Sequence, residues 1–474
     1  MENLKFRTIT DESITLQGQS VKELEEKLRG SLIQPQDEGY DELRAVWNAM
    51  IDRKPALIAR CLGVADVMEV VNFARENKLL ISVRGGGHNI SGASVCEGGI
   101  MIDLSPMQAI HVDPIARIAR VQGGAVFADV DHETQAFGLA VPNGVVSSTG
   151  VGGLTLGGGF GRLSRKYGLT IDNLLSADVV TADGTLVTAS SDRNSDLFWG
   201  IRGGGGNFGI VTSFEFRLHK VGPEVLFGPI VYRLEDAAGV LRNYRNFAAN
   251  APAECSIWAD FVTAPPLPFI PEAVLGTKVL FIVPFYSGDL HKGEEILKPL
   301  REFGKPVADA VAPIPYVTAQ RAIDGLYPKG LRNYWKSHNF VDLPDTTMDT
   351  LIECAKRLPT PQSDILISHL GGAINDIAPD ATVYPHRDIS FVVSPGGRWE
   401  DPAKDTQITD WVRECYDALT DHATGQSYVN FIAEEKGREK EAFGLNYERL
   451  VGLKNKYDPS NLFRLNQNVT PGKI

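Results

Sequence analysis

The stretch Val83-Arg84-Gly85-Gly86-Gly87-His88-Asn89-Ile90-Ser91-Gly92 decides how this chain is interpreted. The apolar run over residues 79–83 that leads into it predicts a buried strand. Three successive glycines then allow positive φ angles and the close approach of a ligand to the main chain. Their free N–H groups could hold a phosphate, and His88 places one nucleophilic side chain at the end of the turn. The alternative interpretation is an ordinary tight turn with a surface histidine.

A second glycine-rich segment covers residues 144–161 and has eight glycines in eighteen residues. A flexible linker would be polar, but the remaining residues here are mostly apolar, so the sequence predicts an ordered and buried main chain. Buried N–H groups need partners, and a dinucleotide pyrophosphate would supply them. Tight packing between a helix and a sheet is the alternative.

A third glycine cluster spans residues 202–209, where Gly204, Gly206 and Gly209 match the pattern G-x-G-x-x-G. A nucleotide-binding βαβ unit requires a strand before that pattern and a helix after it. The residues that follow, 210–218, instead alternate as a strand does. The pattern therefore does not predict a Rossmann fold.

Composition limits the classes of protein that the chain can belong to. Its 474 residues indicate two domains, and its net charge of −12 argues against nonspecific binding of nucleic acid. No apolar run is long enough to span a membrane, and the first residues lack an apolar signal core. The five cysteines are scattered and show no metal-ligand spacing, so we expect reduced thiols, a cytoplasmic location and no metal site.

Motifs at both ends of the chain carry a resemblance to a known family. They keep their order along the sequence: Arg84-Gly-Gly-Gly-His88-Asn89, Gly150-Val-Gly-Gly153, Leu156-Gly-Gly-Gly159-Phe-Gly161, Lys166-Tyr-Gly-Leu169, Asp172-Asn-Leu174, Leu197-Phe-Trp199, Arg202-Gly-Gly-Gly-Gly-Asn-Phe-Gly209, Tyr428-Val-Asn430 and Lys456-Tyr-Asp-Pro-Ser-Asn-Leu-Phe463. Together they resemble the FAD-linked oxidases related to berberine bridge enzyme and 6-hydroxy-D-nicotine oxidase, within the vanillyl-alcohol-oxidase superfamily. The middle of the chain matches only weakly.

The resemblance implies an α+β fold with a two-part FAD-binding domain of the PCMH type and a substrate domain. Prolines and alternating strands and helices between residues 223 and 425 independently predict an antiparallel sheet covered by helices. We therefore expect three segments: 1–222 as the first part of the FAD-binding domain, 223–425 as the substrate-binding domain, and 426–474 returning to the FAD-binding domain.

The resemblance also implies a set of cofactor-binding residues. His88 would bond covalently to the 8α-methyl group of FAD. Some members have a second link from a cysteine, but the matching position here is Val146, so we expect a single covalent link. Val151 falls at the position that governs oxygen access, and valine there favours an oxidase. The predicted FAD-binding residues are Arg84, Gly85, Gly86, Gly87, His88, Asn89, Ser91, Gly92, Gly150, Val151, Gly152, Gly153, Gly158, Gly159, Gly161, Gly209, Ile210, Val211, Tyr428 and Asn430.

The catalytic base is harder to place from sequence. Tyr428 and Asn430 match the family's Tyr-x-Asn near the isoalloxazine, and on a strand they would face the same side. His369, Lys336 and Tyr334 could point inward from the substrate domain, although His and Tyr side chains in sheets are more often structural than catalytic. The acidic or amide base that the family carries after residues 384–387 has no counterpart. Either the base lies elsewhere, or the substrate is already acidic, as a phenol or amine is.

These observations predict an oxidase that transfers a hydride from a small alcohol, amine or phenolic substrate to covalently bound FAD, with molecular oxygen reduced to hydrogen peroxide. The alternatives are a dehydrogenase that uses a quinone or a protein as acceptor, a sugar oxidase, and a non-catalytic flavin-binding protein. The expected partners are a small molecule and oxygen, without nucleic acid or membrane, and the chain is expected to be a monomer or homodimer.

Overall fold

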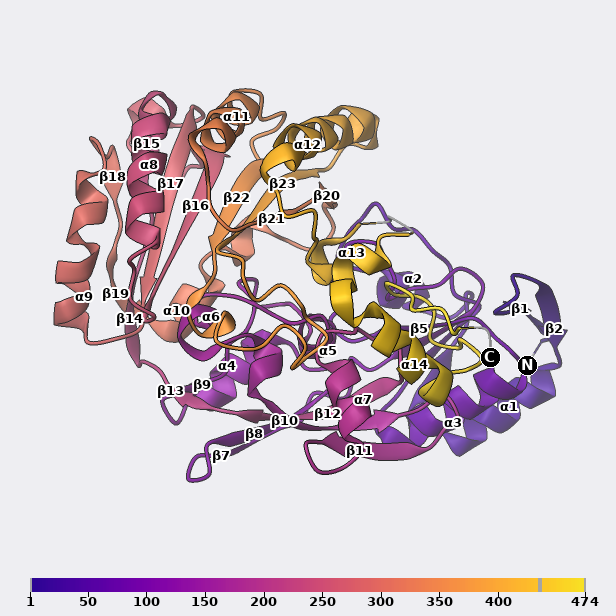
Figure 1. The fold of residues 1–474 in the computed structure, drawn as a ribbon. Coiled ribbons are helices and arrows are strands. Elements are labelled where there is room, and N and C mark those ends of the chain that lie inside the picture. The colour runs from indigo at the N-terminus through magenta and orange to yellow at the C-terminus, as the bar shows by residue number, and fades with distance from the viewer. Residues whose placement is uncertain (1, 434–436, 473–474) are drawn as a thin grey trace.

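The computed structural model describes residues 2–433 and 437–472. It confirms the predicted α+β class, because helices and mostly antiparallel sheets alternate along the chain (Figure 1). Among the described residues, no helix combines the length and the apolar character needed to cross a membrane.

The first sheet carries the glycine turn at the end of one of its strands. Strands β4, β6 and β5 run parallel, and β3 pairs antiparallel with β4 at the edge. Helix α3 packs its apolar face onto this sheet, as the helical spacing of its valines predicted. The bounds are β3 Ser31–Ile33, β4 Leu57–Arg60, α3 Val64–Glu76, β5 Ile81–Arg84 and β6 Ile100–Asp103.

The second sheet is antiparallel and has the order β11-β10-β12-β8-β7. Strand β12 begins at Ile210, directly after the third glycine cluster, so the rejection of a Rossmann unit is confirmed. The bounds are β7 Ile110–Asp113, β8 Ile118–Gln122, α4 Phe127–Gln135, β10 Leu174–Val180, β11 Leu186–Ser190, α7 Ser195–Ile201 and β12 Ile210–Arg217.

The third sheet is large, antiparallel and covered on one face by helices α8, α11 and α12, as predicted (Figure 1). Its central order is β17-β16-β22-β23. The bounds are β14 Glu224–Phe227, β15 Ile230–Arg233, α8 Ala237–Ala248, β16 Cys255–Thr263, β17 Lys278–Tyr286, α9 Leu290–Leu297, β18 Ala308–Asp309, β19 Ala312–Pro315, α10 Tyr316–Arg321, β20 Arg332–Trp335, β21 His338–Phe340, α11 Asp345–Lys356, β22 Asp364–His369, β23 Phe391–Trp399 and α12 Asp405–Leu419.

The C-terminal segment lies against the N-terminal half (Figure 1), where the Arg464 guanidinium donates to the carbonyl of Ile9. Helix α14 contacts α7, and Phe463 packs in the core around the first sheet. The predicted boundaries at 222/223 and 425/426 stay predictions. The remaining bounds are β1 Leu4–Arg7, β2 Ser13–Leu16, α1 Gly18–Lys27, α2 Tyr40–Arg44, β9 Leu139–Ala140, α5 Val151–Leu156, α6 Ser164–Tyr167, β13 His219–Lys220, α13 Glu439–Phe443 and α14 Tyr447–Tyr457.

The sequence missed helix α5, which forms inside the second glycine-rich segment. Glycine is a poor helix former, so the local composition gave no helical signal. The helix forms because it is packed on both sides: the Val151 side chain lies in the core of the second sheet, and the carbonyl of Leu156 accepts bonds from the third glycine cluster.

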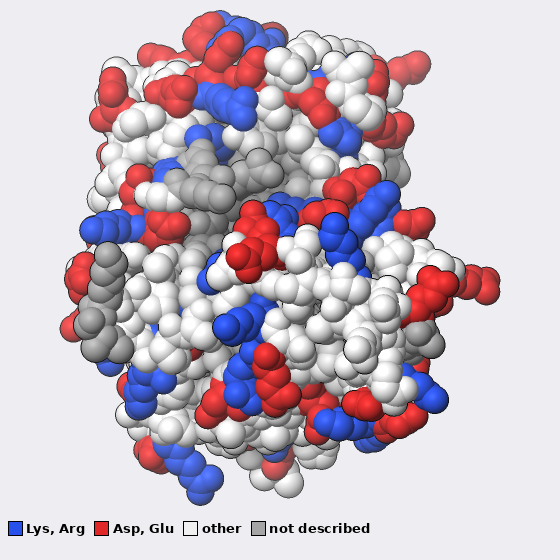
Figure 2. Space-filling model, turned by 90° about the vertical axis from the view of Figure 1, so that its right-hand side faces the viewer, with Lys and Arg blue, Asp and Glu red and all other residues white. Residues whose placement is uncertain are grey.

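Acidic and basic side chains are interspersed on the face shown in Figure 2, and neither sign of charge predominates there. A protein that binds nucleic acid nonspecifically needs a basic face. The net charge and this view therefore agree in giving no support to such a partner.

Candidate active site

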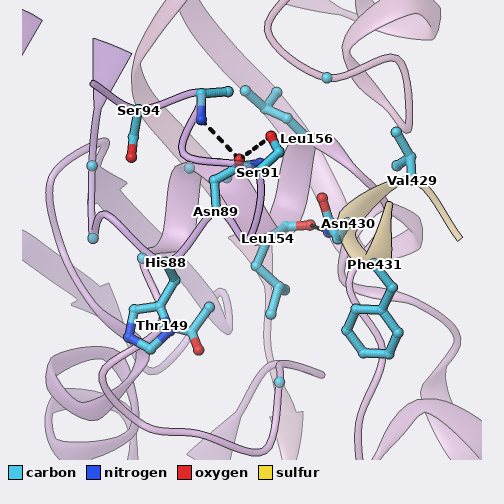
Figure 3. Close-up of a pocket in the computed structure, with 18 of the residues that line it drawn as sticks. His88, Asn89, Ser91, Ser94, Thr149, Leu154, Leu156, Val429, Asn430 and Phe431 are labelled. Atoms are coloured by element: carbon cyan, nitrogen blue, oxygen red, sulfur yellow. Dashed lines mark hydrogen bonds between the residues drawn. The ribbon is translucent and has the colours of Figure 1, made fainter. Parts of the chain in front are cut away.

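A cavity of about 370 Å³ lies between the glycine-rich segments and the large sheet. Its size falls within the range of ligand-binding pockets in proteins. The floor comes from the turn after β5, from helix α5 and from the third glycine cluster. The roof comes from β16, β22 and β23, and residues 428–431 and 463–467 form part of the wall. Figure 3 shows His88, Thr149 and Leu154 together with Asn430 and Phe431 around this space.

The three glycine-rich segments touch one another through their main chains. A Cβ atom on Gly86 would lie 2.4 Å from the nitrogen of Gly150, and a Cβ on Gly150 would lie 2.3 Å from the nitrogen of Gly86. The carbonyl of Leu156 accepts hydrogen bonds from the nitrogens of Gly203 (3.0 Å) and Gly205 (2.9 Å). Glycine is therefore required at positions 86 and 150 because two backbones meet there without room for a side chain.

We expect Gly150→Ala to destabilise the protein and to weaken cofactor retention, because the added methyl group pushes the turn after β5 away from α5. Overpacking of this kind costs about 1–3 kcal/mol. Thermal unfolding of the cofactor-free protein measures the change. The matched control is Gly153→Ala, where a Cβ would meet nothing within 4 Å. Equal melting temperatures for the two variants would contradict the expectation.

His88 lies in the cavity wall and is held on two sides. Its Nε2 is 2.9 Å from Ser148 Oγ, and its ring stacks on Trp47 with centroids 5.1 Å apart. The side chain is only half-buried because the cavity reaches it, but protein surrounds it closely enough for burial to lower its pKa to about 4. The imidazole is consequently neutral near pH 7 and retains a nitrogen lone pair.

Most of the predicted cofactor-binding residues line the cavity, and six do not. Those that line it are Gly85, Gly86, Gly87, His88, Asn89, Ser91, Gly150, Gly152, Gly153, Gly209, Ile210, Val211, Tyr428 and Asn430. Those outside its lining are Arg84, Gly92, Val151, Gly158, Gly159 and Gly161. Arg84 donates instead to the carbonyl of Leu43, and Val151 is fully buried in the core of the second sheet.

Tyr428 and Asn430 meet as expected, but not on a strand. They belong to a 3₁₀ turn over Val429–Phe431 that begins after Tyr428, so the predicted strand is wrong. Asn430 Nδ2 donates to Tyr428 Oη (2.8 Å) and to the carbonyl of Leu154 (3.1 Å), and the nitrogen of Gly159 also donates to Tyr428 Oη (3.0 Å). Burial raises the pKa of Tyr428 to about 12. Tyr428 is therefore protonated at neutral pH and joins the wall to the glycine-rich floor.

His369, Lys336 and Tyr334 do not line the cavity, so the expectation that they point inward is corrected. His369 lies on the helix-covered face of β22, where it accepts from Arg165 Nη1 at 2.9 Å and stacks on Phe391. The Lys336 ammonium lies 4.0 Å from the centroid of the Tyr416 ring. Side chains alternate between the two faces of a strand, and the neighbours Ser368 and Trp335 take the cavity-facing positions.

The roof of the cavity contains polar residues that sequence analysis did not single out. Asp364 on β22 and Arg398 on β23 form a buried ion pair at 2.8 Å, and Tyr327 Oη donates to the same carboxylate at 2.7 Å. These residues are far apart in sequence and belong to no family motif. Only the pairing of β22 with β23, which sets Asp364 opposite Gly396, brings them together. No local signal in the sequence pointed to them.

The floor also includes polar residues that were missed. Asn207 is fully buried and joins the third glycine cluster to the C-terminal segment through bonds to Gly204, Gln467 and Val469. Buried polar atoms in the lining that have no hydrogen-bond partner among the described residues include Ser82 Oγ, Ser94 Oγ, Ser394 Oγ and Asn466 Oδ1. Buried polar atoms are normally satisfied, so these are positions where a polar ligand would bind.

Among the described residues, no group of three or more His, Cys, Asp and Glu side chains is arranged to hold a metal ion. The five cysteines in the described chain are free and buried, and none of them lines the cavity. Val146, the position for which the sequence predicted no second covalent link, does line it.

Comparisons with known proteins agree along nearly the whole chain. A family model described as FAD binding domain matches residues 55–190, and one described as berberine and berberine like matches residues 427–470. An FAD-linked oxidoreductase of Dictyostelium discoideum is 32% identical over 458 residues, covering 96% of this chain and 97% of that protein. The (R)-6-hydroxynicotine oxidase of Paenarthrobacter nicotinovorans is also 32% identical and covers 94% and 97% of the two chains.

Solved structures show the same fold. The crystal structure of 6-hydroxy-D-nicotine oxidase from Arthrobacter nicotinovorans superposes with a TM-score of 0.85 at 30% identity, covering 94% of this chain and 98% of that one. Berberine bridge enzyme from Eschscholzia californica superposes with a TM-score of 0.86 at 22% identity, covering 96% and 99%.

Proposed function

Because the chain belongs to the berberine-like family of FAD-linked oxidoreductases, we propose that it is an oxidase that holds FAD covalently through His88 and oxidises a small alcohol, amine or phenol. The observation that carries this proposal is the convergence of three glycine-rich segments and one neutral histidine on a single cavity.

The cavity residues fit FAD. Main chain without side chains allows close approach of a pyrophosphate, and the unpartnered Ser94 Oγ and Asn466 Oδ1 offer hydrogen bonds to a polar ligand. His88 stacks on Trp47, whose ring also contacts Trp335 of the large sheet at a centroid distance of 5.7 Å, so these residues lie where the floor meets the roof. Bound FAD would supply the hydride acceptor in this cavity, and we propose that molecular oxygen would take up the electrons and be reduced to hydrogen peroxide.

His88 has the properties that a covalent link requires. A neutral imidazole can act as a nucleophile, and burial keeps this one neutral. Its Nε2 is next to Ser148 Oγ. If Nε2 carries the proton and donates a hydrogen bond to Ser148, the lone pair is on Nδ1, and Nδ1 would be the nitrogen available for a covalent link. A single link is supported by the absence of cysteine from the described cavity lining.

The predicted role of Val151 in oxygen access has no direct support from its position, because it packs in the core and not at the cavity surface. The choice of oxygen as acceptor depends on the family relationship. The cytoplasmic location and the monomeric or homodimeric state stay predictions.

A peroxide-coupled screen tests the function. Purified protein in air is given small alcohols, amines and phenols, and flavin absorbance near 450 nm and peroxide are recorded together. We expect at least one class to release one peroxide for each substrate molecule oxidised, and to bleach the flavin once the oxygen is used up. Bleaching without peroxide would indicate a dehydrogenase, and a flavin that stays oxidised with every compound would indicate a binding protein; both results would contradict the proposal.

A further inference from the structure

One carboxylate in the roof of the cavity, that of Asp364, accepts its hydrogen bonds through only one of its two oxygens. Asp364 Oδ2 accepts from Tyr327 Oη at 2.7 Å and from Arg398 Nη2 at 2.8 Å. The Arg398 guanidinium also lies 3.9 Å from the centroid of the Tyr327 ring. Only 5% of the Asp364 side chain is exposed. Its position is therefore well defined, and it does not depend on a ligand.

The second oxygen of Asp364 is left open toward the cavity. No described residue donates a hydrogen bond to Oδ1, and Asp364 lines the cavity. Glycine at position 396, directly opposite on β23, leaves space beside this oxygen, because a Cβ there would lie 2.9 Å from Oδ1. Ser394, two residues away and also in the lining, has a buried Oγ without a partner among the described residues. Two polar atoms thus face the cavity unsatisfied.

A second carboxyl group lies on the same face of the sheet. Asp260 is two residues from the cavity-lining Trp258 on β16 and is paired with the cavity-lining Leu366. Its Oδ1 is buried and has no hydrogen-bond partner among the described residues. Burial and, to a lesser degree, the charge of Asp364 raise the pKa of Asp260, while Arg398 lowers it. Tyr327 is the other titratable group that interacts with it.

The Asp364 carboxylate is the negatively charged group that the described cavity lining offers to a ligand. Burial raises the pKa of Asp260 well above its ordinary value and favours its protonated form, and Arg398 is paired with Asp364 Oδ2. Among the described residues that line the cavity, only Asp364 and Arg398 carry charged side chains, and His88 is neutral near pH 7. A positively charged donor would make a charge-assisted hydrogen bond to the open Oδ1, whereas an anion there would be repelled.

We propose that the roof cluster, formed by Asp260, Tyr327, Asp364, Ser394 and Arg398, binds the protonated amino group of a small amine, with Asp364 Oδ1 accepting its N–H. This inference rests on the proposed function and names the substrate class for it. The proposed role is binding alone: no covalent bond forms or breaks, and no electrons leave the substrate in this step.

Two compounds of nearly equal shape, one an amine and one an alcohol, allow binding to be measured without oxidation of the ligand. In 2-phenylpropan-2-amine and 2-phenylpropan-2-ol, the carbon next to the heteroatom has no hydrogen, so neither compound can be oxidised there. Calorimetry on the flavin-containing protein at pH 7 measures their affinities. We expect the amine to bind at least about tenfold more tightly than the alcohol, since hydrogen bonds to charged groups are worth about 1.5–3 kcal/mol, or about 10- to 150-fold.

Asp364→Asn keeps the shape of the side chain and removes its charge. We expect it to weaken binding of the amine by about 10- to 100-fold and to leave the affinity for the alcohol within about twofold. The matched control is Asp349→Asn, an exposed acid of α11 in the same part of the chain, which is expected to leave both affinities unchanged.

Gly396→Ala keeps the test decisive if loss of the Asp364 charge impairs folding, because its added methyl group would lie 2.9 Å from Asp364 Oδ1 and obstruct that oxygen without removing the ion pair. We expect a several-fold loss of affinity for the amine. Equal binding of amine and alcohol by the unmodified protein, or amine affinity unchanged in both variants, would overturn the proposal. Because neither probe is oxidised, these results do not depend on whether the peroxide screen succeeds.

Discussion

Replacing His88 with alanine is expected to remove all flavin that survives acid denaturation. The unmodified protein should precipitate as a yellow pellet, because a histidine nitrogen bonded to the flavin resists unfolding of the chain. His88 is the histidine in the cavity lining of the described chain, and its neutral state leaves one nitrogen free to form that bond. The absorbance of the washed, redissolved pellet measures the covalent fraction directly.

The control for this experiment is His132→Ala, which changes a surface histidine with a 75% exposed side chain. It should leave the yellow pellet unchanged. The His88 variant should still fold, since the three glycine-rich segments keep their main-chain contacts, and it should bind FAD reversibly. A yellow pellet from His88→Ala would exclude this residue as the attachment point and would direct attention to another nucleophile.

The second large effect is expected at Lys454, a fully buried lysine on α14. Its ammonium donates to Asp458 Oδ2 (2.7 Å) and to the carbonyls of Asn207 (2.8 Å) and Phe463 (2.9 Å). The carboxylate of Asp458 in turn accepts from the nitrogens of residues 462 and 463. Burial lowers the pKa of Lys454. This group of contacts joins α14 to both the third glycine cluster and the C-terminal wall of the cavity.

Lys454→Met keeps most of the side-chain volume and removes the charge, which leaves Asp458 buried without its counter-ion. Breaking a buried ion pair in this way costs about 3–5 kcal/mol. We expect a large fall in unfolding temperature, together with loss of any flavin that is not covalently held, because residues 204–209 and 463–467 lose their common anchor.

Lys456→Met provides the comparison on the same helix. Lys456 pairs with Asp196 at the surface and is more than half exposed, and exposed pairs contribute about 0–1 kcal/mol. Melting curves recorded for both variants with and without added FAD separate stability from binding. If the two variants melt alike, the buried contacts of Lys454 do not stabilise the protein as argued.

Some of the site could be predicted from sequence because its signal is local. Glycine runs that follow an apolar strand can be recognised from neighbouring residues alone. The residues around them were apolar enough to exclude a linker. The same holds for β12 after Gly209, whose alternation ruled out a Rossmann unit. A site where a ligand contacts the main chain requires glycines in place of residues with side chains, and the sequence shows these glycines directly.

The predictions from sequence were wrong where the orientation of a side chain or the packing of a segment determines the structure. His369 and Ser368 are adjacent, yet one faces the helices and the other the cavity. Successive side chains of a strand point to opposite faces of the sheet, so a shift of one position moves a side chain from the core face to the cavity face. Helix α5 formed against the weak helix propensity of its glycines because neighbouring segments satisfy it on both sides. The Tyr428-x-Asn430 pair met through a 3₁₀ turn, which the two-residue spacing alone does not distinguish from a strand.

The amino-acid sequence by itself determined the order of the glycine-rich segments and the position of His88 among them, since both depend on residues close together in the chain, and the family resemblance of its motifs implied the α+β class. Only the tertiary structure decided that Asp260, Asp364 and Arg398 share one face above that histidine. Their meeting depends on the register of three antiparallel strands drawn from about 140 residues of sequence, and register is set by long-range hydrogen bonding and core packing, which no local pattern records.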